Sequence, residues 1–313
     1  MCEYETVAKI AMLRDGIKVS RAPGYNPNPV KRGKATGWSE GAARRNRDFL
    51  MAVDGDQLRD PSSGDPFALS LTFGRQKTVS PADLKSCREA FFCRLRRRGL
   101  IRLHWLVEFQ RDGTPHLHML AYMPANTLPE SVAACLRDMW LEVTAPWGST
   151  ACGQYVVPVG HLTGWKQYLA KHGVRGVRHY QRQMPDGWEV PGRMWGKLGE
   201  WPTWSAEVEC DLDTFFRFRR LLRSYRIAAA RSELANANPA DRAAKRAAIR
   251  HARRCLRHPF RDGNRRTSMR GAALWLPREV SGRMLMHLAS MPGAFVRDWA
   301  ERDTLPRSDQ RGL

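Results

Sequence analysis

The chain has 313 residues, and its 42% hydrophobic content is enough for a packed core and argues against intrinsic disorder. Its 52 Lys and Arg against 31 Asp and Glu give a formal net charge of +21, which favours a polyanionic partner, either nucleic acid or an anionic membrane surface. The sequence contains no apolar run of roughly 18 residues, so a membrane-spanning helix is not expected.

The N-terminus lacks an apolar segment flanked by basic residues, so we expect no signal peptide. The seven cysteines are odd in number and include no Cys-x-x-Cys pair. These features favour a reduced, cytoplasmic protein without structural disulfides or a cysteine-based zinc site.

We expect residues 1–60 to be a basic N-terminal extension with one short helix within 37–56. The alternating stretch FALSLTF at 67–73 predicts a strand with Leu69, Leu71 and Phe73 on one face. Residues 80–99 carry helix signals: Ser80 as the cap, Pro81 in the first turn, Asp83 completing a capping box and Gly99 as the stop. Leu84, Cys87, Phe91 and Leu95 share one face of that helix.

Two strands, 101–110 and 115–123, flank Arg-Asp-Gly-Thr, which indicates a hairpin. A helix at 127–144, opened by a Thr-x-x-Glu box, a strand at 152–159 and a short helix at 163–173 follow. Thr163 is the expected cap of the last helix and Gly173 its stop. The order β-α-β-β-α-β predicts an α+β fold with a ferredoxin-like or RNA-recognition-like antiparallel sheet and flanking helices.

Composition changes near residue 206. Residues 217–270 hold seventeen Lys and Arg against three acidic residues, a net +14 of the +21. We therefore divide the chain into the extension at 1–60, the βαββαβ domain at 61–205 and a basic, largely helical region at 206–313.

Two histidines stand out on the third strand, where His116 and His118 flank Leu117. Alternate residues of a strand point to one face, so both imidazoles can chelate one divalent ion. By itself this pattern also fits two half-exposed histidines on a polar sheet face.

The register of the hairpin decides whether a carboxylate joins the histidines. A three-residue Arg111-Asp112-Gly113 loop pairs Gln110 with Thr114 and places Glu108 opposite His116. A two-residue Asp-Gly turn would move Glu108 to the other face. We favour the first, because the second puts a charge in the core. His104 shares the parity of Glu108 and is an alternative ligand.

Tyr168 and Lys171 are three residues apart on the expected helix at 163–173, so they share a face. Tyrosine can act as a covalent nucleophile when nearby positive charge stabilises the developing oxyanion. Without the histidines, amphipathic packing of Trp165, Tyr168 and Leu169 would explain the pattern equally well.

Together, LSLTF, PHLHML and YLAKH resemble, in order, the three motifs of the His-hydrophobe-His (HUH) endonuclease superfamily. This superfamily includes rolling-circle replication initiators and conjugative relaxases. The stretches EFQRDGTPHLHML, GWSEGAARRNRDFLMAVD and GRMWGKLGEWP are similar to the phage and plasmid initiators related to the filamentous-phage gene II protein. The resemblance spans roughly residues 37–205, with a weaker one at RRTSMRGAALWLP.

The resemblance implies that His116, His118 and Glu108 bind Mg²⁺ or Mn²⁺ and that Tyr168 attacks a DNA phosphodiester, forming a 5′-phosphotyrosine with Lys171 stabilising charge. Some relatives have a second tyrosine four residues later, where this chain has His172, so one nucleophile is expected. The implied partners are duplex and single-stranded origin DNA and a host helicase, polymerase and single-strand-binding protein, but no membrane. The basic residues that we expect to contact DNA are Arg175, Arg178, Arg193, Lys197, Arg217, Arg219, Arg220, Arg253 and Arg254.

Other functions use the same elements. A relaxase or transposase of the superfamily would make the same nick. A non-catalytic RNA-recognition-like module would need stacking aromatics where this chain has HLHML. A small-molecule phosphodiesterase would need neither the basic region nor a tyrosine. The sequence contains no Walker-type phosphate loop, so unwinding is expected from a partner.

Overall fold

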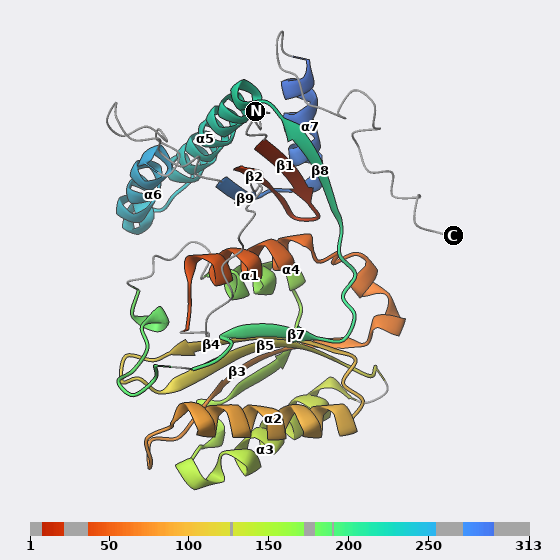
Figure 1. Cartoon of the computed structure of the whole chain (residues 1–313), viewed down its shortest axis with the longest axis vertical. Coiled ribbons are helices and arrows are strands. Elements are labelled where there is room, and N and C mark those ends of the chain that lie inside the picture. Colours follow the sequence, from red (N-terminus) through yellow and green to blue (C-terminus); the bar gives the residue numbers. More distant parts are fainter. Residues whose placement is uncertain are drawn as a thin grey trace, which may run out of the picture. The chain divides into compact units, whose positions relative to one another are not determined.

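The structure, a computed structural model, describes residues 8–21, 37–125, 128–171, 179–189, 191–254 and 272–290. The chain forms two compact units (Figure 1). One consists of residues 30–203, and the other combines the two chain ends, 1–29 and 204–313.

The unit at 30–203 is built on a five-stranded antiparallel sheet with the strand order β6-β3-β5-β4-β7. In chain order its main elements are β3 (Asp65–Thr72), α2 (Pro81–Arg97), β4 (Arg102–Phe109), β5 (Pro115–Met123), α3 (Pro129–Val143) and β6 (Tyr155–Pro158). This confirms the predicted α+β class and βαββαβ order. The strand β7 (Trp195–Leu198) adds an edge beside β4.

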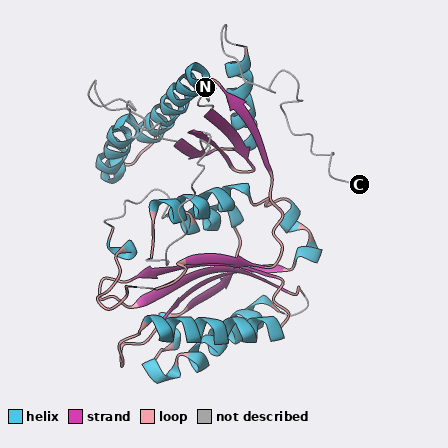
Figure 2. Cartoon of the chain, in the orientation of Figure 1, coloured by secondary structure: helices cyan, strands magenta, loops and turns pink. Residues whose placement is uncertain are grey.

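Helices cover both faces of this sheet (Figure 2). The helices α2 and α3 lie on one face, and α1 (Glu40–Ala52) and α4 (Leu162–Leu169) lie on the other. The predicted inner face of α2 is buried, and the Phe91 ring meets Trp140 of α3 edge to face at 5.4 Å. No helix among the described residues is long and apolar enough to cross a membrane.

The structure confirms the predicted cap of α2 but not that of α4. Ser80 and Asp83 form the capping box of α2, and Gly99 has a φ of +83° just after its end. In contrast, α4 is capped by His161, whose Nδ1 accepts from the Gly164 amide, and not by the predicted Thr163. This helix ends at Leu169, and Gly173 lies outside the described residues.

The helix α3 begins after Leu128, which offers no side-chain cap. The predicted cap, Thr127, lies outside the described residues. Short 3₁₀ turns connect the larger elements: Gln57–Arg59, Pro61–Ser63, Ala145–Trp147, Ala151–Gly153, Tyr180–Arg182 and Pro239–Asp241.

The second unit has its own antiparallel sheet in the order β8-β1-β2-β9. Its elements are β1 (Ala8–Leu13), β2 (Gly16–Arg21), β8 (Ser205–Cys210), α5 (Leu212–Ala235), α6 (Arg242–Arg254), β9 (Ala272–Trp275) and α7 (Arg278–Ala289). Apolar residues of β1, β2, α5 and α7 form one buried core, among them Ile10, Ile17, Phe215, Phe218 and Leu285.

This second sheet changes the predicted division of the chain. β1 pairs with β8 along six residues, from Ala8 opposite Cys210 to Leu13 opposite Ser205. The strands β1 and β2 are therefore a structural part of the C-terminal unit, whereas the prediction treated 1–60 as an extension. The described residues of 206–313 are largely helical, as predicted, and add the strands β8 and β9. The predicted short helix, α1, belongs to the other unit. The sequence around β1 or β8 does not indicate this pairing, because the two strands lie far apart along the chain.

Candidate active site

The β4–β5 hairpin has the register that places its polar residues together. The Gln110 amide donates to the Thr114 carbonyl at 2.9 Å, and Gly113 has a φ of +81°. Glu108 therefore lies opposite His116, and Leu106 opposite His118. The three-residue loop predicted for Arg111-Asp112-Gly113 is confirmed.

Two hydroxyl residues of β3 lie opposite the two histidines. Ser70 lies opposite His118 and Thr72 opposite His116. The Ser70 hydroxyl lies 2.7 Å from His118 Nδ1. Gln110 Nε2 donates to Thr72 Oγ1 at 3.0 Å and lies 3.5 Å from His116 Nδ1. A partner on one ring nitrogen orients the imidazole, so the other nitrogen of His118 faces the carboxylate of Glu108.

Glu108 is fully buried, and three nitrogen groups surround its carboxylate. His118 Nε2 lies 3.2 Å from Oε2, and Gln181 Nε2 donates to the same oxygen at 2.8 Å. The Lys171 ammonium lies 2.7 Å from Oε1. A buried carboxylate needs such partners, because its desolvation would otherwise be prohibitive.

Tyr168 reaches this cluster from α4. Its hydroxyl lies 3.2 Å from His118 Nε2, and its ring meets His118 edge to face at 4.9 Å. Lys171 lies beyond the end of α4, yet its ammonium is 3.9 Å from the centre of the Tyr168 ring. The tyrosine residue is 39% exposed. The structure thus brings together all five residues that the sequence predicted for the site.

The residues fit a divalent metal ion in chemistry, although the side chains are not arranged around one. Among the described residues, no three His, Cys, Asp or Glu side chains stand in metal-binding geometry. The ammonium of Lys171 is the cation beside Glu108 instead. Burial, followed by the neighbouring His118, lowers the pKa of His116 to about 3. His116 is therefore neutral near pH 7, as a metal ligand must be.

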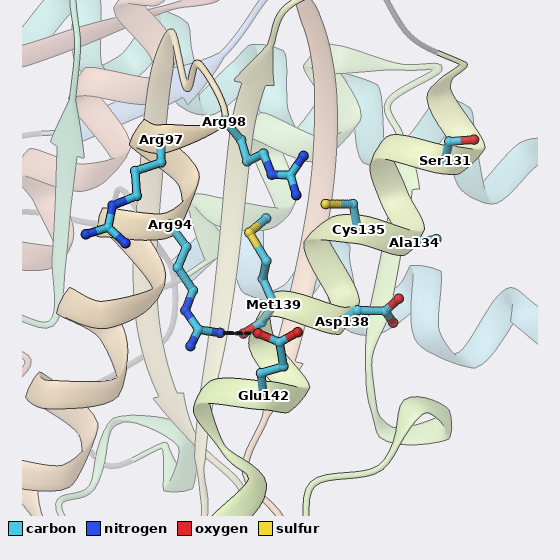
Figure 3. Close-up of a pocket in the computed structure, with 9 residues that line it drawn as sticks. All are labelled: Arg94, Arg97, Arg98, Ser131, Ala134, Cys135, Asp138, Met139 and Glu142. Atoms are coloured by element: carbon cyan, nitrogen blue, oxygen red, sulfur yellow. Dashed lines mark hydrogen bonds and ion pairs between the residues drawn. The ribbon is translucent and has the colours of Figure 1, made fainter.

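A cavity of about 510 Å³ opens over this cluster. Its lining includes four predicted site residues, Glu108, His116, His118 and Tyr168, together with Arg75, Arg111, Tyr180 and Gln181. Another cavity, of about 610 Å³, lies between α2 and α3, away from the histidines (Figure 3). Its Arg94 is paired with Glu142 at 2.6 Å, and its lining holds no histidine or tyrosine, so it is not a candidate for the same chemistry.

His104, the alternative ligand, lies away from the cluster. Its ring is fully buried, and its Nε2 lies 2.7 Å from Asn46 Oδ1. His104 and Glu108 lie on the same face of β4, as predicted. However, His104 lies too far along the strand for its ring to contact the Glu108 carboxylate. Tyr155 and Tyr180 are 53% and 41% exposed, and neither has an interaction with His118 comparable to that of Tyr168 among the contacts described.

The predicted DNA-binding residues lie in several places. Arg193 and Lys197 are exposed near the β7 edge, where they line a cavity of about 670 Å³. In the other unit, Arg220 and Arg253 are exposed and Arg217 is partly buried, whereas Arg219 is only 5% exposed and its guanidinium lies 5.8 Å from the centre of the Phe215 ring. Arg219 is therefore poorly placed for a surface contact. Arg175 and Arg178, and the side chain of Arg254, lie outside the described residues.

The sequence analysis missed Ser70, Thr72 and Gln181. The first two had a usable signal: in LSLTF they alternate with the core leucines, so they share the face of the histidines once β3 pairs with β5. Gln181 had none, because it comes from the Tyr180–Arg182 turn, which reaches β4 only in the folded chain.

The known proteins that this chain resembles are all described as replication proteins. Residues 66–173 match the family described as Replication-associated protein ORF2/gene II protein. A putative replication protein of Xylella fastidiosa strain 9a5c is 38% identical over 298 residues, covering 91% of this chain and 96% of that protein. The replication-associated gene II protein of Pseudomonas phage Pf3 is 40% identical over 215 residues, covering 67% of this chain and 75% of that protein. The matched span contains every residue of the cluster except Gln181.

Proposed function

Because this chain belongs to the ORF2/gene II family of replication-associated proteins, we propose that it is a rolling-circle replication initiator of the His-hydrophobe-His endonuclease superfamily. It nicks one strand of origin DNA and stays covalently attached to the 5′ phosphate through Tyr168. The observation that carries this proposal is the Tyr168 hydroxyl at 3.2 Å from His118 Nε2, beside a cluster of two histidines and a buried carboxylate.

In the proposed reaction, the Tyr168 oxygen attacks the scissile phosphorus. The bond from phosphorus to the 3′ oxygen breaks, and that oxygen takes up a proton to become the 3′ hydroxyl that primes synthesis. The phenol proton is released. The Lys171 ammonium, 3.9 Å from the tyrosine ring, stabilises negative charge that develops at the phenol oxygen and the phosphate. Attack by a later 3′ hydroxyl on the phosphotyrosine reverses the step and rejoins DNA.

His116, His118 and Glu108 would hold a Mg²⁺ or Mn²⁺ ion. When bound, the ion supplies Lewis-acid polarisation of the scissile phosphate. The Lys171 ammonium, 2.7 Å from Glu108 Oε1, would keep the buried carboxylate charged and add positive charge beside the substrate phosphate. Ser70 keeps the His118 ring oriented throughout, because its hydroxyl contacts the nitrogen that does not face Glu108.

The proposal implies particular partners. The substrate is origin DNA, duplex for recognition and single-stranded for cleavage, and a host helicase, polymerase and single-strand-binding protein complete replication in the bacterial cytoplasm. The net charge of +21 supports binding of a polyanion.

The experiment that tests the proposal looks for the covalent adduct. The protein is incubated with labelled single-stranded origin DNA and Mn²⁺, denatured and separated by electrophoresis. We expect one labelled band in the wild type, its loss with EDTA or in Tyr168→Phe, and its retention in Tyr180→Phe. An adduct that survives in Tyr168→Phe, or DNA mapped to Tyr155 or Tyr180, contradicts the assignment.

A relaxase or transposase of the same superfamily would form the same adduct, and only the DNA it acts on distinguishes it. The names of the relatives, all replication proteins, favour an initiator. A non-catalytic RNA-recognition-like module is disfavoured, because such modules stack bases on an open sheet face. Here α1 and α4 lie over one face of the sheet (Figure 1), and Tyr168 of α4 contacts His118 on that face.

A further inference from the structure

The nucleophile helix α4 is too short to be stable by itself. It has eight residues, whereas isolated helices below about 12 residues are marginal in water. Its position must therefore come from contacts with the rest of the unit. Two of its side chains make such contacts: Trp165 Nε1 donates to the Met119 carbonyl of β5 at 3.1 Å, and the buried Lys166 ammonium donates to the Val53 carbonyl at 2.8 Å.

A third contact comes from α1 and lies next to the tyrosine. Asn46 is fully buried, and its Nδ2 donates to the Leu169 carbonyl at 3.0 Å. The last carbonyls of a helix have no partner within the helix, so the end of α4 needs an external donor. Asn46 supplies that donor at the residue that follows Tyr168.

The oxygen of the Asn46 amide has its own hydrogen-bond partner, His104. Because Asn46 Nδ2 points to Leu169, its Oδ1 faces His104, and His104 Nε2 donates to it at 2.7 Å. The ring stacks on Phe49 of α1 at 5.7 Å and lies 6.0 Å from Trp195. Burial lowers the pKa of His104 to about 3, so the ring is neutral near pH 7 and one of its nitrogens carries no proton. The bond to Asn46 assigns the proton to Nε2.

We propose that Asn46 is a positioning residue for the nucleophile: through its bond to the Leu169 carbonyl it holds the end of α4 so that the Tyr168 hydroxyl stays beside His118. This inference rests on the proposed function for its consequence in catalysis. The bond between Asn46 and Leu169 can be tested apart from that function, because in the contacts described Asn46 touches neither Glu108 nor the histidines of the cluster.

Three variants separate positioning from stability. Asn46→Leu removes the bond to Leu169 and leaves the His104 donor unpaired. His104→Phe keeps the bond to Leu169 but leaves Asn46 Oδ1 without its donor. The double variant Asn46→Leu/His104→Phe removes both polar partners at once, which is often nearly neutral for stability, yet it still lacks the bond to Leu169.

The measurements are the thermal midpoint, the single-turnover rate of adduct formation at saturating DNA and Mn²⁺, and amide hydrogen exchange in residues 162–169 of the full chain. We expect the rate to fall about 10- to 100-fold in Asn46→Leu and in the double variant, because a displacement near 1 Å has this effect on a reacting group. In both, exchange in α4 should accelerate, while DNA and Mn²⁺ affinities stay unchanged. His104→Phe should keep a rate within about threefold of wild type despite a lower midpoint.

A purely structural role predicts a different pattern, in which the rate and the α4 exchange of the double variant recover together with its midpoint. That result overturns the inference. If Asn46→Leu does not fold, the double variant and the milder Asn46→Ser carry the same comparison. If the wild type forms no adduct, the proposed function fails, and hydrogen exchange alone then decides whether Asn46 holds α4.

Discussion

Two hairpins of this chain turn at the same three residues, Arg-Asp-Gly, with different registers. In the β1–β2 hairpin Leu13 pairs with Gly16, so the turn contains only Arg14 and Asp15. In the β4–β5 hairpin Gln110 pairs with Thr114, and the loop contains Arg111, Asp112 and Gly113.

The difference follows from the strands and not from the turn. With its two-residue turn, the first hairpin pairs Ile10 with Val19 and Met12 with Ile17, all buried in the core. One more loop residue would place Lys18 opposite Met12. In the second hairpin, one fewer would place Glu108 opposite Leu117, which faces the core. Each hairpin adopts the register that keeps its charged residues off the apolar face of the sheet, because a slip of one residue moves every side chain to the other face.

The largest difference that we expect between the two hairpins is in the effect of substitutions on catalysis. His116→Ala and His118→Ala should each abolish detectable adduct formation, because each removes a proposed metal ligand, while DNA binding stays largely intact. Lys9→Ala in β1, which loses only exposed ion pairs to Glu207 and Glu209, is the matched control and should keep wild-type activity. The adduct assay and a DNA-binding titration measure both. Adduct formation at the wild-type rate in either histidine variant would contradict the proposed metal site.

The register has a direct consequence at Glu108. We expect Glu108→Ala to weaken Mn²⁺ affinity by more than about tenfold, since even residues behind the ligands contribute 10- to 100-fold. Calorimetric titration with Mn²⁺ measures the affinity without relying on cleavage. If the Mn²⁺ dependence is unchanged, the third ligand lies elsewhere, even though Glu108 faces His116.

Ser70 should show a smaller effect of the same kind. Ser70→Ala removes the hydroxyl at 2.7 Å from His118 Nδ1, so we expect Mn²⁺ affinity to fall about tenfold. Ser20→Ala, in the strand of the other hairpin, is the matched control and should leave the affinity unaltered. Equal affinities of Ser70→Ala and wild type would mean that the His118 ring needs no orienting partner.

The second unit should contribute to DNA affinity through its exposed arginines. Replacing Arg220 and Arg253 with Gln should reduce the slope of log affinity against log salt by about 0.9 for each phosphate that the protein no longer neutralises. Arg219→Gln, at a buried position, should leave this slope unchanged and lower the thermal midpoint instead. A slope that responds to Arg219 but not to the exposed pair would reverse this assignment.

The smallest expected effect concerns the loop itself. Gly113 has a φ of +81°, so Gly113→Val should lower the free energy of unfolding by about 1–2 kcal/mol, whereas Gly113→Asn should be tolerated better. Urea unfolding followed by fluorescence compares the two. Equal stability of the Val and Asn variants would show that the loop can change its conformation without cost.

The sequence alone predicted what depends on local patterns. The βαββαβ order followed from hydrophobic periodicity and turn residues, and the capping box at Ser80 and Asp83 followed from spacing. The strand parity of His116 and His118, and the favoured loop at Gly113, brought Glu108 to the same face. Tyr168 and Lys171 were identified with the cluster through motif order, and the structure brings them into contact with it.

Only the tertiary structure decided what depends on distant segments. The pairing of β1 with β8 joined the two chain ends into one unit, because backbone hydrogen bonds between strands are indifferent to sequence separation. Gln181 reached Glu108 and Asn46 reached Leu169 across 73 and 123 residues. Such contacts do not follow a periodic pattern in the sequence. Each one satisfies a single donor or acceptor that folding buries away from water.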